Sequence, residues 1–145
     1  MEHLRPTMAA IDLAALRDNI AAVRAQIAPG CKMLAAVKGD AYGHGAVQCA
    51  MALSPLVDAF AVAITEEAIA LRDAGIDSPI LVLQGPHSRE DAQIMSSAAL
   101  WPAISGEHQI DWLEQTGAQF EQIWLKCDTG MHRLGFMPNE IAPAR

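Results

Sequence analysis

The chain has 145 residues, of which 52% are hydrophobic and 5% aromatic, so it is long enough for one buried core and too apolar to be disordered. Its net charge of −7, from 10 basic and 17 acidic residues without a basic run, argues against a nucleic-acid-binding surface. Three separated cysteines, no signal-like apolar core and no apolar stretch of spanning length predict a cytoplasmic protein without disulfides or a membrane segment.

The N-terminal part of the chain predicts a helix that leads into a strand. Apolar residues recur at helical spacing between positions 13 and 27, which is typical of an amphipathic helix. Asp12 is suited to cap its first turn, and Gly30 to end it. An apolar run over residues 32–37 then predicts the first strand.

Short apolar runs alternate with helical patterns along the rest of the chain. They predict further strands at residues 60–64, 80–83, 100–104 and 123–127. Thr65, Ser88 and Ser105 are predicted helix N-caps, and Gly75 and Gly117 are predicted helix ends. Continuous apolar strands separated by helices are typical of parallel strands buried on both faces. The pattern therefore predicts an α/β fold, either an open doubly wound sheet or part of a closed barrel.

Two charged residues that could take part in chemistry follow the C-terminal ends of predicted strands. Lys38 follows the strand at 32–37, and Arg133 follows the strand at 123–127. Active sites of (β/α)8 barrels lie at this rim, which favours a barrel. Because a complete barrel takes about 250 residues, the chain would supply only its first five βα units.

Lys38 is the first candidate for a catalytic residue. A lysine at the exit of a buried strand is costly unless its amine has a task, and a neutral amine forms a Schiff base with an aldehyde. Tyr42, the only tyrosine, lies in the small-residue turn after Lys38, where its hydroxyl can donate to an anion. Gln48 stands where a dinucleotide-binding G-x-G-x-x-G loop needs its third glycine. A lysine after a strand is usually a solvated loop residue, so position alone favours that alternative for Lys38, and the presence of Tyr42 in the same turn is what favours a functional role.

A second candidate segment reads Lys126-Cys-Asp-Thr-Gly-Met-His-Arg133-Leu-Gly. The planar fork of Arg133 can hold a carboxylate, although a loop salt bridge with Asp128 is an alternative. Lys126 lies within an apolar strand and needs a partner or a modification. Cys127 is predicted to pack in the core. The five histidines show no metal-binding spacing, so no metal site is predicted.

Both segments resemble motifs of the alanine racemase family. Residues 36–45, A-V-K-G-D-A-Y-G-H-G, are similar to its cofactor-lysine motif, and residues 126–135 are similar to its K-x-D-T-G-M-x-R-L-G motif. Residues 6–13 and 80–85 resemble the family's opening segment and its third strand. The resemblance implies that residues 1–145 form the N-terminal portion of a pyridoxal-phosphate-binding (β/α)8 barrel, with the C-terminal β-domain absent.

The resemblance also implies a role for each candidate residue. Lys38 would be linked to pyridoxal 5′-phosphate and would exchange the substrate's α-proton on one face. Tyr42 would bind the cofactor phosphate. Arg133 would face the phenolic oxygen of the cofactor and the substrate carboxylate. Lys126 matches a position that is often carbamylated, where the new anion orients the arginine.

The implied activity is the interconversion of L- and D-alanine, which supplies D-alanine for peptidoglycan. The resemblance further implies a homodimer in which the second base, a tyrosine, comes from the partner's C-terminal domain, so residues 1–145 alone are expected to be inactive. A non-catalytic pyridoxal-phosphate-binding barrel and an inactive racemase fragment remain as alternatives. The D-T-G-M-x-R-L-G pattern favours the racemase.

Overall fold

The computed structural model describes residues 7–141 of the chain, so Pro6, with which the family-like opening segment begins, lies outside the described residues. Five parallel strands form one sheet in the order β1-β2-β3-β4-β5. Their bounds are β1 Leu34–Ala36, β2 Ala59–Val62, β3 Ile80–Val82, β4 Trp101–Ile104 and β5 Trp124–Leu125. Each strand lies at its predicted position, and the strands are shorter than the apolar runs that predicted them.

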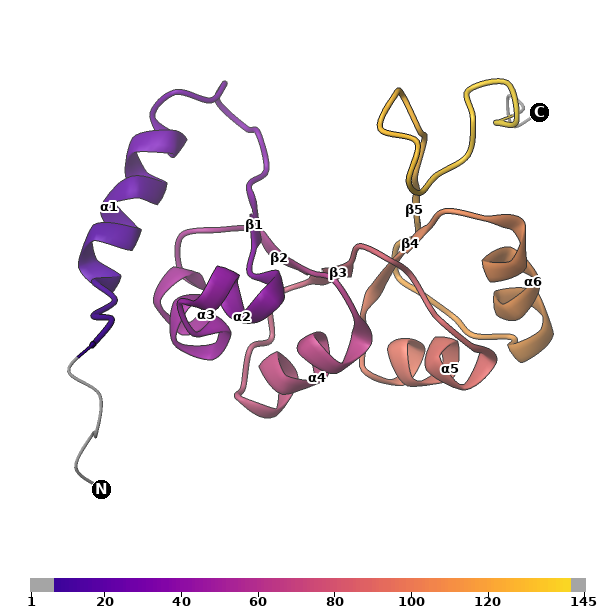
Figure 1. Ribbon diagram of the computed structural model, residues 1–145, viewed down its shortest axis with the longest axis horizontal. Coiled ribbons are helices and arrows are strands. Elements are labelled where there is room, and N and C mark those ends of the chain that lie inside the picture. Colours follow the sequence, from indigo (N-terminus) through magenta and orange to yellow (C-terminus); the bar gives the residue numbers. More distant parts are fainter. Residues whose placement is uncertain (1–6, 142–145) are drawn as a thin grey trace.

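Helices follow each of the first four strands and lie on one side of the sheet (Figure 1). Their bounds are α2 Lys38–Gly43, α3 Ala46–Leu53, α4 Thr65–Asp73, α5 Arg89–Ser97 and α6 Glu107–Thr116, while α1, Leu13–Arg24, precedes the sheet and packs against α3. A doubly wound sheet reverses its strand order and carries helices on both faces. The consecutive order with helices on one side is that of a (β/α)8 barrel, of which the chain forms about five units.

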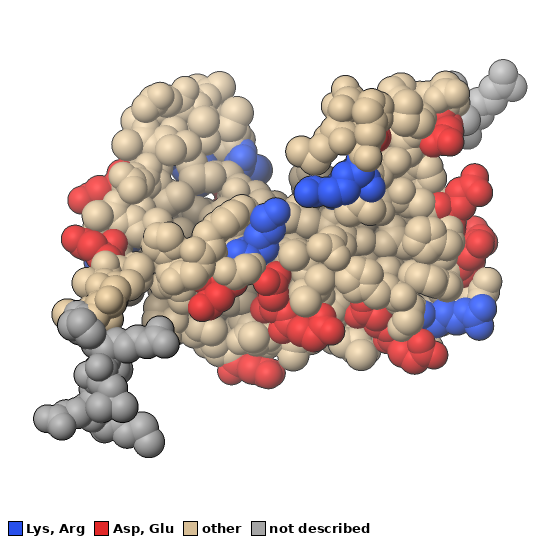
Figure 2. Space-filling model, viewed as in Figure 1, with Lys and Arg blue, Asp and Glu red and all other residues tan. Residues whose placement is uncertain are grey.

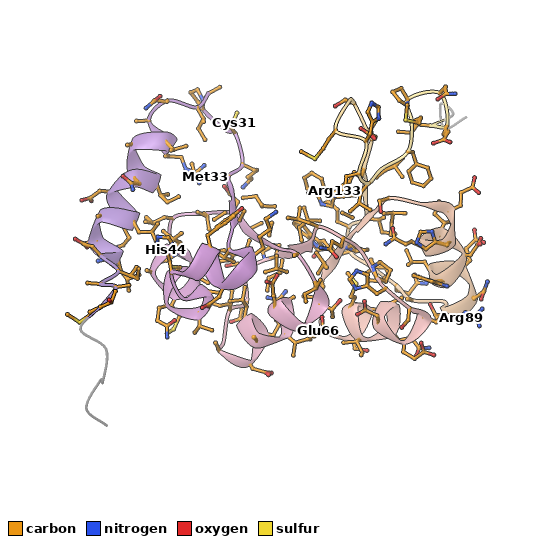
Figure 3. All side chains as sticks on the ribbon, viewed as in Figure 1. Cys31, Met33, His44, Glu66, Arg89 and Arg133 are labelled. Atoms are coloured by element: carbon orange, nitrogen blue, oxygen red, sulfur yellow. The ribbon has the colours of Figure 1, made fainter. Side chains whose placement is uncertain are left out.

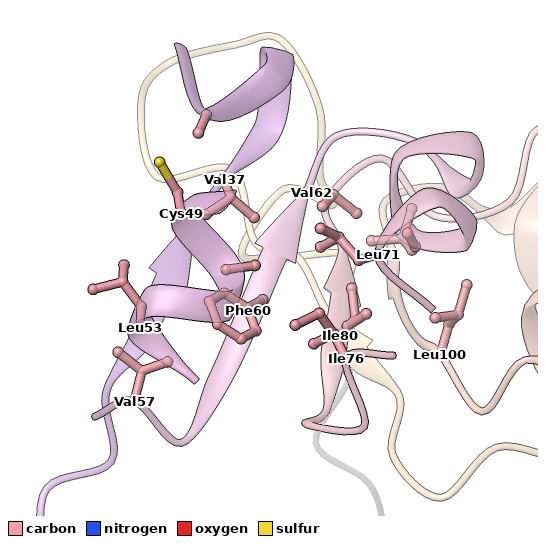
Figure 4. Close-up of a cluster of buried hydrophobic side chains, with 14 of the residues drawn as sticks. Val37, Cys49, Leu53, Val57, Phe60, Val62, Leu71, Ile76, Ile80 and Leu100 are labelled. Carbon is pink, nitrogen blue, oxygen red and sulfur yellow. The ribbon is translucent and has the colours of Figure 1, made fainter. Parts of the chain in front are cut away.

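The main core lies between the sheet and the helices (Figure 4). Phe60 and Val62 of β2 and Ile80 and Val82 of β3 contribute to it and are completely buried. Successive strand residues point to opposite faces, so Ala61 and its neighbours form a second, smaller cluster on the other face. In a barrel that face is the interior, so the two central strands are buried on both faces as predicted.

The fifth strand differs from the prediction. β5 is two residues long, and its Trp124 and Leu125 side chains are 43% and 53% exposed. The predicted burial of residues 123–127 is therefore wrong, and so is the predicted core packing of Cys127, which is exposed. The reason is position, because β5 pairs with β4 on one side and forms the edge of the described sheet.

The predicted helix caps have mixed outcomes. Asp12 caps α1, accepting hydrogen bonds from Ala14 N at 2.9 Å and Ala15 N at 3.0 Å, and Ser88 caps α5. The predicted caps Thr65 and Ser105 are wrong. Ile64 and Gly106 occupy those cap positions, and the buried Thr65 hydroxyl has no hydrogen-bond partner among the described residues. α1 also ends earlier than its apolar spacing predicted, at Arg24.

Candidate active site

The turn that follows β1 has an unusual backbone conformation. From Gly39 to Tyr42 four successive residues have φ between 52° and 60° and ψ between 34° and 46°, which makes one left-handed helical turn. Left-handed geometry costs a residue other than glycine roughly 1–2 kcal/mol, and Asp40, Ala41 and Tyr42 all adopt it. We call residues 38–45 the lysine turn. The small-residue pattern predicted a turn here, but not its hand.

Several hydrogen bonds hold the lysine turn. Ala41 N donates to Val37 O at 2.8 Å, and Gly45 N donates to Asp40 O at 2.9 Å. The Asp40 carboxylate accepts from Ala46 N at 2.7 Å, at the first residue of α3. Val37 and Ala41 are buried in the main core, so the turn is fixed from beneath by packing. Lys38 itself is half-buried.

The segment after β5, residues 126–136, forms a second loop, which we call the arginine loop. Asp128 Oδ1 accepts from Gly130 N at 2.9 Å and from His132 N at 3.0 Å. These amides, Gly130 first, hold the pKa of the Asp128 carboxyl below its usual range. Asp128 Oδ2 lies 3.2 Å from His132 Nδ1. The structure shows no Asp128–Arg133 ion pair within residues 7–141, so Arg133 is left for another role.

Lys126 connects the arginine loop to the end of β3. Its Nζ donates to the Leu83 carbonyl oxygen at 2.7 Å, so it has the partner that was predicted. Its predicted place within the strand is wrong, because β5 ends at Leu125 and Lys126 directly follows it. Burial of the amine is the largest cause of a lowered Lys126 pKa, and the positive charges of Arg133 and Lys38 add to it. The two cations therefore lie close enough to Lys126 to act on its charge.

Lys38, Lys126 and Arg133 line one pocket with a volume of about 510 Å³. Ala63, Leu83, Gln84 and Leu134 complete its lining. It lies at the C-terminal ends of the strands, where Figure 2 shows the molecule hollowed between α1 and the arginine loop, with basic side chains around the hollow. In Figure 3 Arg133 lies at the base of the arginine loop, on the side that faces the strands. Residues 95 positions apart thus form one cationic pocket.

Tyr42 does not line this pocket. Its side chain is 65% exposed and borders a neighbouring apolar pocket of about 450 Å³ between α1 and the lysine turn. Of the four site residues predicted from the sequence, three line the same pocket and the fourth, Tyr42, lines the neighbouring one.

Sequence reasoning missed two residues that shape the pocket rim. The buried Gln109 accepts from Ser105 N at 2.7 Å and donates to Gln84 O at 2.7 Å and Pro86 O at 3.0 Å, so it joins the loops after β3 and β4. Glu67 of α4 accepts from two backbone amides beside the pocket. The only sequence signal was a polar residue at a core-facing helix position in the first case, and a carboxylate in a first helical turn in the second.

Two kinds of feature are absent from the described residues. No helix within residues 7–141 is long and apolar enough to cross a membrane. No group of three or more His, Cys, Asp or Glu side chains in that part of the chain is arranged to hold a metal ion.

The fold and the pocket define a class of protein: a parallel βα-barrel segment with two amines and a guanidinium at the C-terminal ends of its strands. The family model for the alanine racemase N-terminal domain matches residues 11–144. Since that match covers nearly the whole chain, the chain belongs to the alanine racemase family and corresponds to its N-terminal domain.

Individual relatives agree with this assignment. The chain is 50% identical over 135 residues to the alanine racemase of Chromohalobacter salexigens, covering 92% of this chain and 37% of the relative. It is 45% identical over 146 residues to that of Xanthomonas axonopodis pv. citri, covering 97% of this chain and 38% of the relative. The crystal structure of the biosynthetic alanine racemase of Pseudomonas aeruginosa superposes with a TM-score of 0.82 at 37% identity, covering 90% of this chain and 36% of that one. The chain thus spans less than two fifths of these relatives' length.

Proposed function

We propose that the chain is the cofactor-holding portion of an alanine racemase, which interconverts L- and D-alanine with pyridoxal 5′-phosphate. The observation that carries the proposal is the convergence of Lys38, Lys126 and Arg133 on one pocket. The proposed cellular role is the supply of D-alanine for peptidoglycan in the cytoplasm.

The pocket residues fit this cofactor. Pyridoxal phosphate has an aldehyde that an amine can attack, and a phenolate and a phosphate that cationic groups attract. The pocket offers two amines and one guanidinium, and Ala63, Leu83 and Leu134 supply apolar surface for a flat ring. When bound, the cofactor supplies an electron sink for the charge left at the substrate α-carbon.

Lys38 is assigned the covalent attachment and the proton transfer. Its amine would hold the cofactor at the carbonyl carbon, with the carbonyl oxygen lost as water. When the substrate's amine takes its place there, the freed Lys38 amine would take and return the α-proton on one face of the substrate. The half-buried Lys38 starts a turn whose backbone is fixed by hydrogen bonds and by the core, which limits the directions from which its amine can act. Tyr42 is assigned to the phosphate on the family pattern alone.

Arg133 and Lys126 are assigned to work together. The Arg133 guanidinium would hold the substrate carboxylate and face the phenolic oxygen. Carbamylation of Lys126 would join its neutral amine nitrogen to the carbon of carbon dioxide and release one proton, leaving an anion beside Arg133. The lowered Lys126 pKa supports this step because it increases the neutral fraction of the amine.

Racemisation also needs a proton donor on the opposite face of the substrate. We propose that a tyrosine of the C-terminal domain supplies it from the partner in a homodimer, as the family pattern implies. Residues 1–145 alone are therefore expected to bind the cofactor and to show no L-to-D turnover at enzymatic rates of about 1–10³ s⁻¹. An assay with added cofactor that found such turnover would contradict the two-base proposal.

Reductive trapping tests the attachment site. The chain contains only three lysines, Lys32, Lys38 and Lys126, so a labelled position is easy to assign. The chain is incubated with pyridoxal phosphate, reduced with borohydride and mapped by peptide mass spectrometry. We expect the label on Lys38, with Lys32 as the internal control because its side chain is 85% exposed. Equal labelling of Lys32 and Lys38 would contradict the proposal.

A second measurement tests the carbamate. Isotope-labelled bicarbonate is added and the carbamate carbon is observed by NMR, with Lys126→Arg as the control variant. We expect one signal that the variant lacks. A signal that persists in Lys126→Arg would exclude Lys126 as its source.

A further inference from the structure

Glu67, in the first turn of α4, uses both carboxylate oxygens to hold backbone that borders the pocket. Its Oε1 accepts from Gly39 N at 2.6 Å, and its Oε2 accepts from Ala63 N at 2.7 Å. Gly39 is the residue after Lys38, and Ala63 follows β2 and lines the pocket with Lys38. One side chain thus joins the lysine turn to the end of the neighbouring strand.

The lysine turn has a specific need for this contact. Three of its residues other than glycine are left-handed, so the turn persists only where its surroundings fix it. Gly39 is the first left-handed residue, and the hydrogen bond from its N–H is made to a different element of the fold. That bond fixes the point at which the chain changes hand, directly after Lys38.

We propose that Glu67 is a positioning residue that sets the direction of the Lys38 amine by clamping Gly39 to Ala63. The inference rests on the function proposed above for Lys38. Both bonds are charge-assisted, and the carboxylate lies at a helix N-terminus, where a negative charge is favoured. The acid–base chemistry proposed for Lys38 requires nothing from Glu67 itself, which acts only through the backbone.

The clamp requires a carboxylate rather than an amide. A carboxylate accepts at both oxygens, whereas glutamine has one acceptor oxygen and presents an NH₂ group to the second N–H. Glu67→Gln therefore breaks one bond and sets two donors against each other. Glu66 provides a matched control, since it lies in the same first turn, is exposed, and accepts no hydrogen bond within residues 7–141.

Hydrogen exchange tests the clamp without any cofactor. The exchange rates of the Gly39 and Ala63 amides are measured by NMR in the unchanged chain, in Glu67→Gln and in Glu66→Gln. We expect about a tenfold faster exchange at one or both amides in Glu67→Gln, as loss of one charge-assisted bond implies. Glu66→Gln is expected to leave both rates unchanged. Equal rates in all three proteins would overturn the clamp.

Reductive trapping then tests the effect on Lys38. The rate of Lys38 labelling with pyridoxal phosphate and borohydride is divided by the rate at Lys32 in the same sample. We expect this ratio to fall about tenfold in Glu67→Gln, in proportion to the loss of the bond, and to stay constant in Glu66→Gln. Urea unfolding of each variant separates this local effect from a loss of folding, which would lower the signal at every position.

The outcomes distinguish the two proposals. Absence of selective Lys38 labelling in the unchanged chain would overturn the proposed function and this inference with it. Selective labelling of equal rate in the unchanged chain and in Glu67→Gln would overturn the inference alone. If Glu67→Gln does not fold, Glu67→Asp replaces it, because it keeps the charge but is one methylene too short to reach both amides. The same fall in the labelling ratio is then expected.

Discussion

The lysine turn and the arginine loop both hold cationic residues at the pocket, but different interactions fix their backbones. The lysine turn carries one cationic residue of the pocket, Lys38, and the arginine loop carries two, Lys126 and Arg133. In both segments a carboxylate accepts from backbone amides, at Gly39 in the lysine turn and at Gly130 and His132 in the arginine loop. Glu67, which holds Gly39 of the lysine turn, comes from another helix, although the turn also has its own Asp40 bonded to Ala46 N, whereas the arginine loop is held by its own Asp128. The lysine turn is therefore a tertiary structure that depends on packing, and the arginine loop is a local structure that depends mainly on itself.

The two segments also differ in how far they are buried. The lysine turn rests on Val37 and Ala41 within the main core. In the arginine loop Asp128 is the one buried residue, and most of the others are exposed beside the edge strand β5. In the proposed mechanism the residue that must transfer a proton is on the rigid side, and the residue that holds the carboxylate is on the side that can adjust. Four changes test that division.

Phe60→Ala is expected to have the largest effect. Phe60 is completely buried in β2 at the centre of the core, and truncation of such a residue costs about 3–5 kcal/mol. Urea unfolding measures the loss. Leu125→Ala in β5 is the control, with an expected cost within about 0.5 kcal/mol since Leu125 is 53% exposed. Similar losses of unfolding free energy in the two variants would contradict the view that the core beneath the lysine turn contributes more stability than the edge strand beside the arginine loop.

Gln109→Ala is expected to destabilise the chain by about 1–3 kcal/mol, because it leaves buried loop groups without partners. The loop that Gln109 holds includes Leu83, whose carbonyl oxygen is the partner of Lys126. The change should therefore disturb the Lys126 side of the pocket more than the lysine turn, as amide chemical shifts would show. Gln115→Ala on the exposed face of α6 is the control.

The arginine loop is expected to loosen in acid. The Asp128 pKa is lower in the folded chain than in the unfolded chain, where it is about 3.9. The Asp128 carboxylate therefore contributes its full stabilisation above about pH 4, and this is lost as the pH falls through the folded pKa. The Gly130 and His132 amide resonances should report the change, and Asp128→Asn should remove it. If the Gly130 and His132 resonances changed with pH in the same way in Asp128→Asn as in the unchanged chain, the effect would belong to another group.

Asp40→Ala is expected to have the smallest effect. The Asp40 carboxylate accepts from Ala46 N at the start of α3, as an N-cap side chain does, and loss of such a cap costs about 1 kcal/mol. Urea unfolding again provides the measurement, with Asp111→Ala on exposed α6 for comparison. A cost near that of Phe60→Ala would mean that the lysine turn depends on its own carboxylate as much as on the core.

The sequence predicted the fold class because the strands are short apolar runs between helical patterns. The choice between a barrel and a doubly wound sheet depends on strand order, which periodicity does not contain. The position of Lys38 and Arg133 after strands and the family resemblance predicted the barrel, and the consecutive strand order confirms it. The burial of β5 was overestimated because an apolar run does not reveal whether a strand has neighbours on both sides.

The candidate site was partly predictable. Lys38, Lys126 and Arg133 stood out because charged residues beside buried strands are costly, and the structure brings these three to one pocket. Glu67 and Gln109 did not stand out, since a carboxylate in a first helical turn is ordinary and a buried glutamine resembles an exposed one in sequence. Their roles depend on backbone amides and carbonyls of distant loops, which the residue types do not encode.

The consecutive strand order has a consequence for how the chain folds. Each strand pairs with the strand synthesised just before it, so the sheet contacts join segments that are close in sequence. The loop that must close before two strands pair is therefore one βα unit and no longer, which limits the loop entropy lost at each pairing. During translation the strand with which each new βα unit pairs has already been synthesised, so the sheet can grow from β1 toward β5 as the chain emerges. The lysine turn, at the end of β1, would be enclosed by its neighbours before the arginine loop has been made.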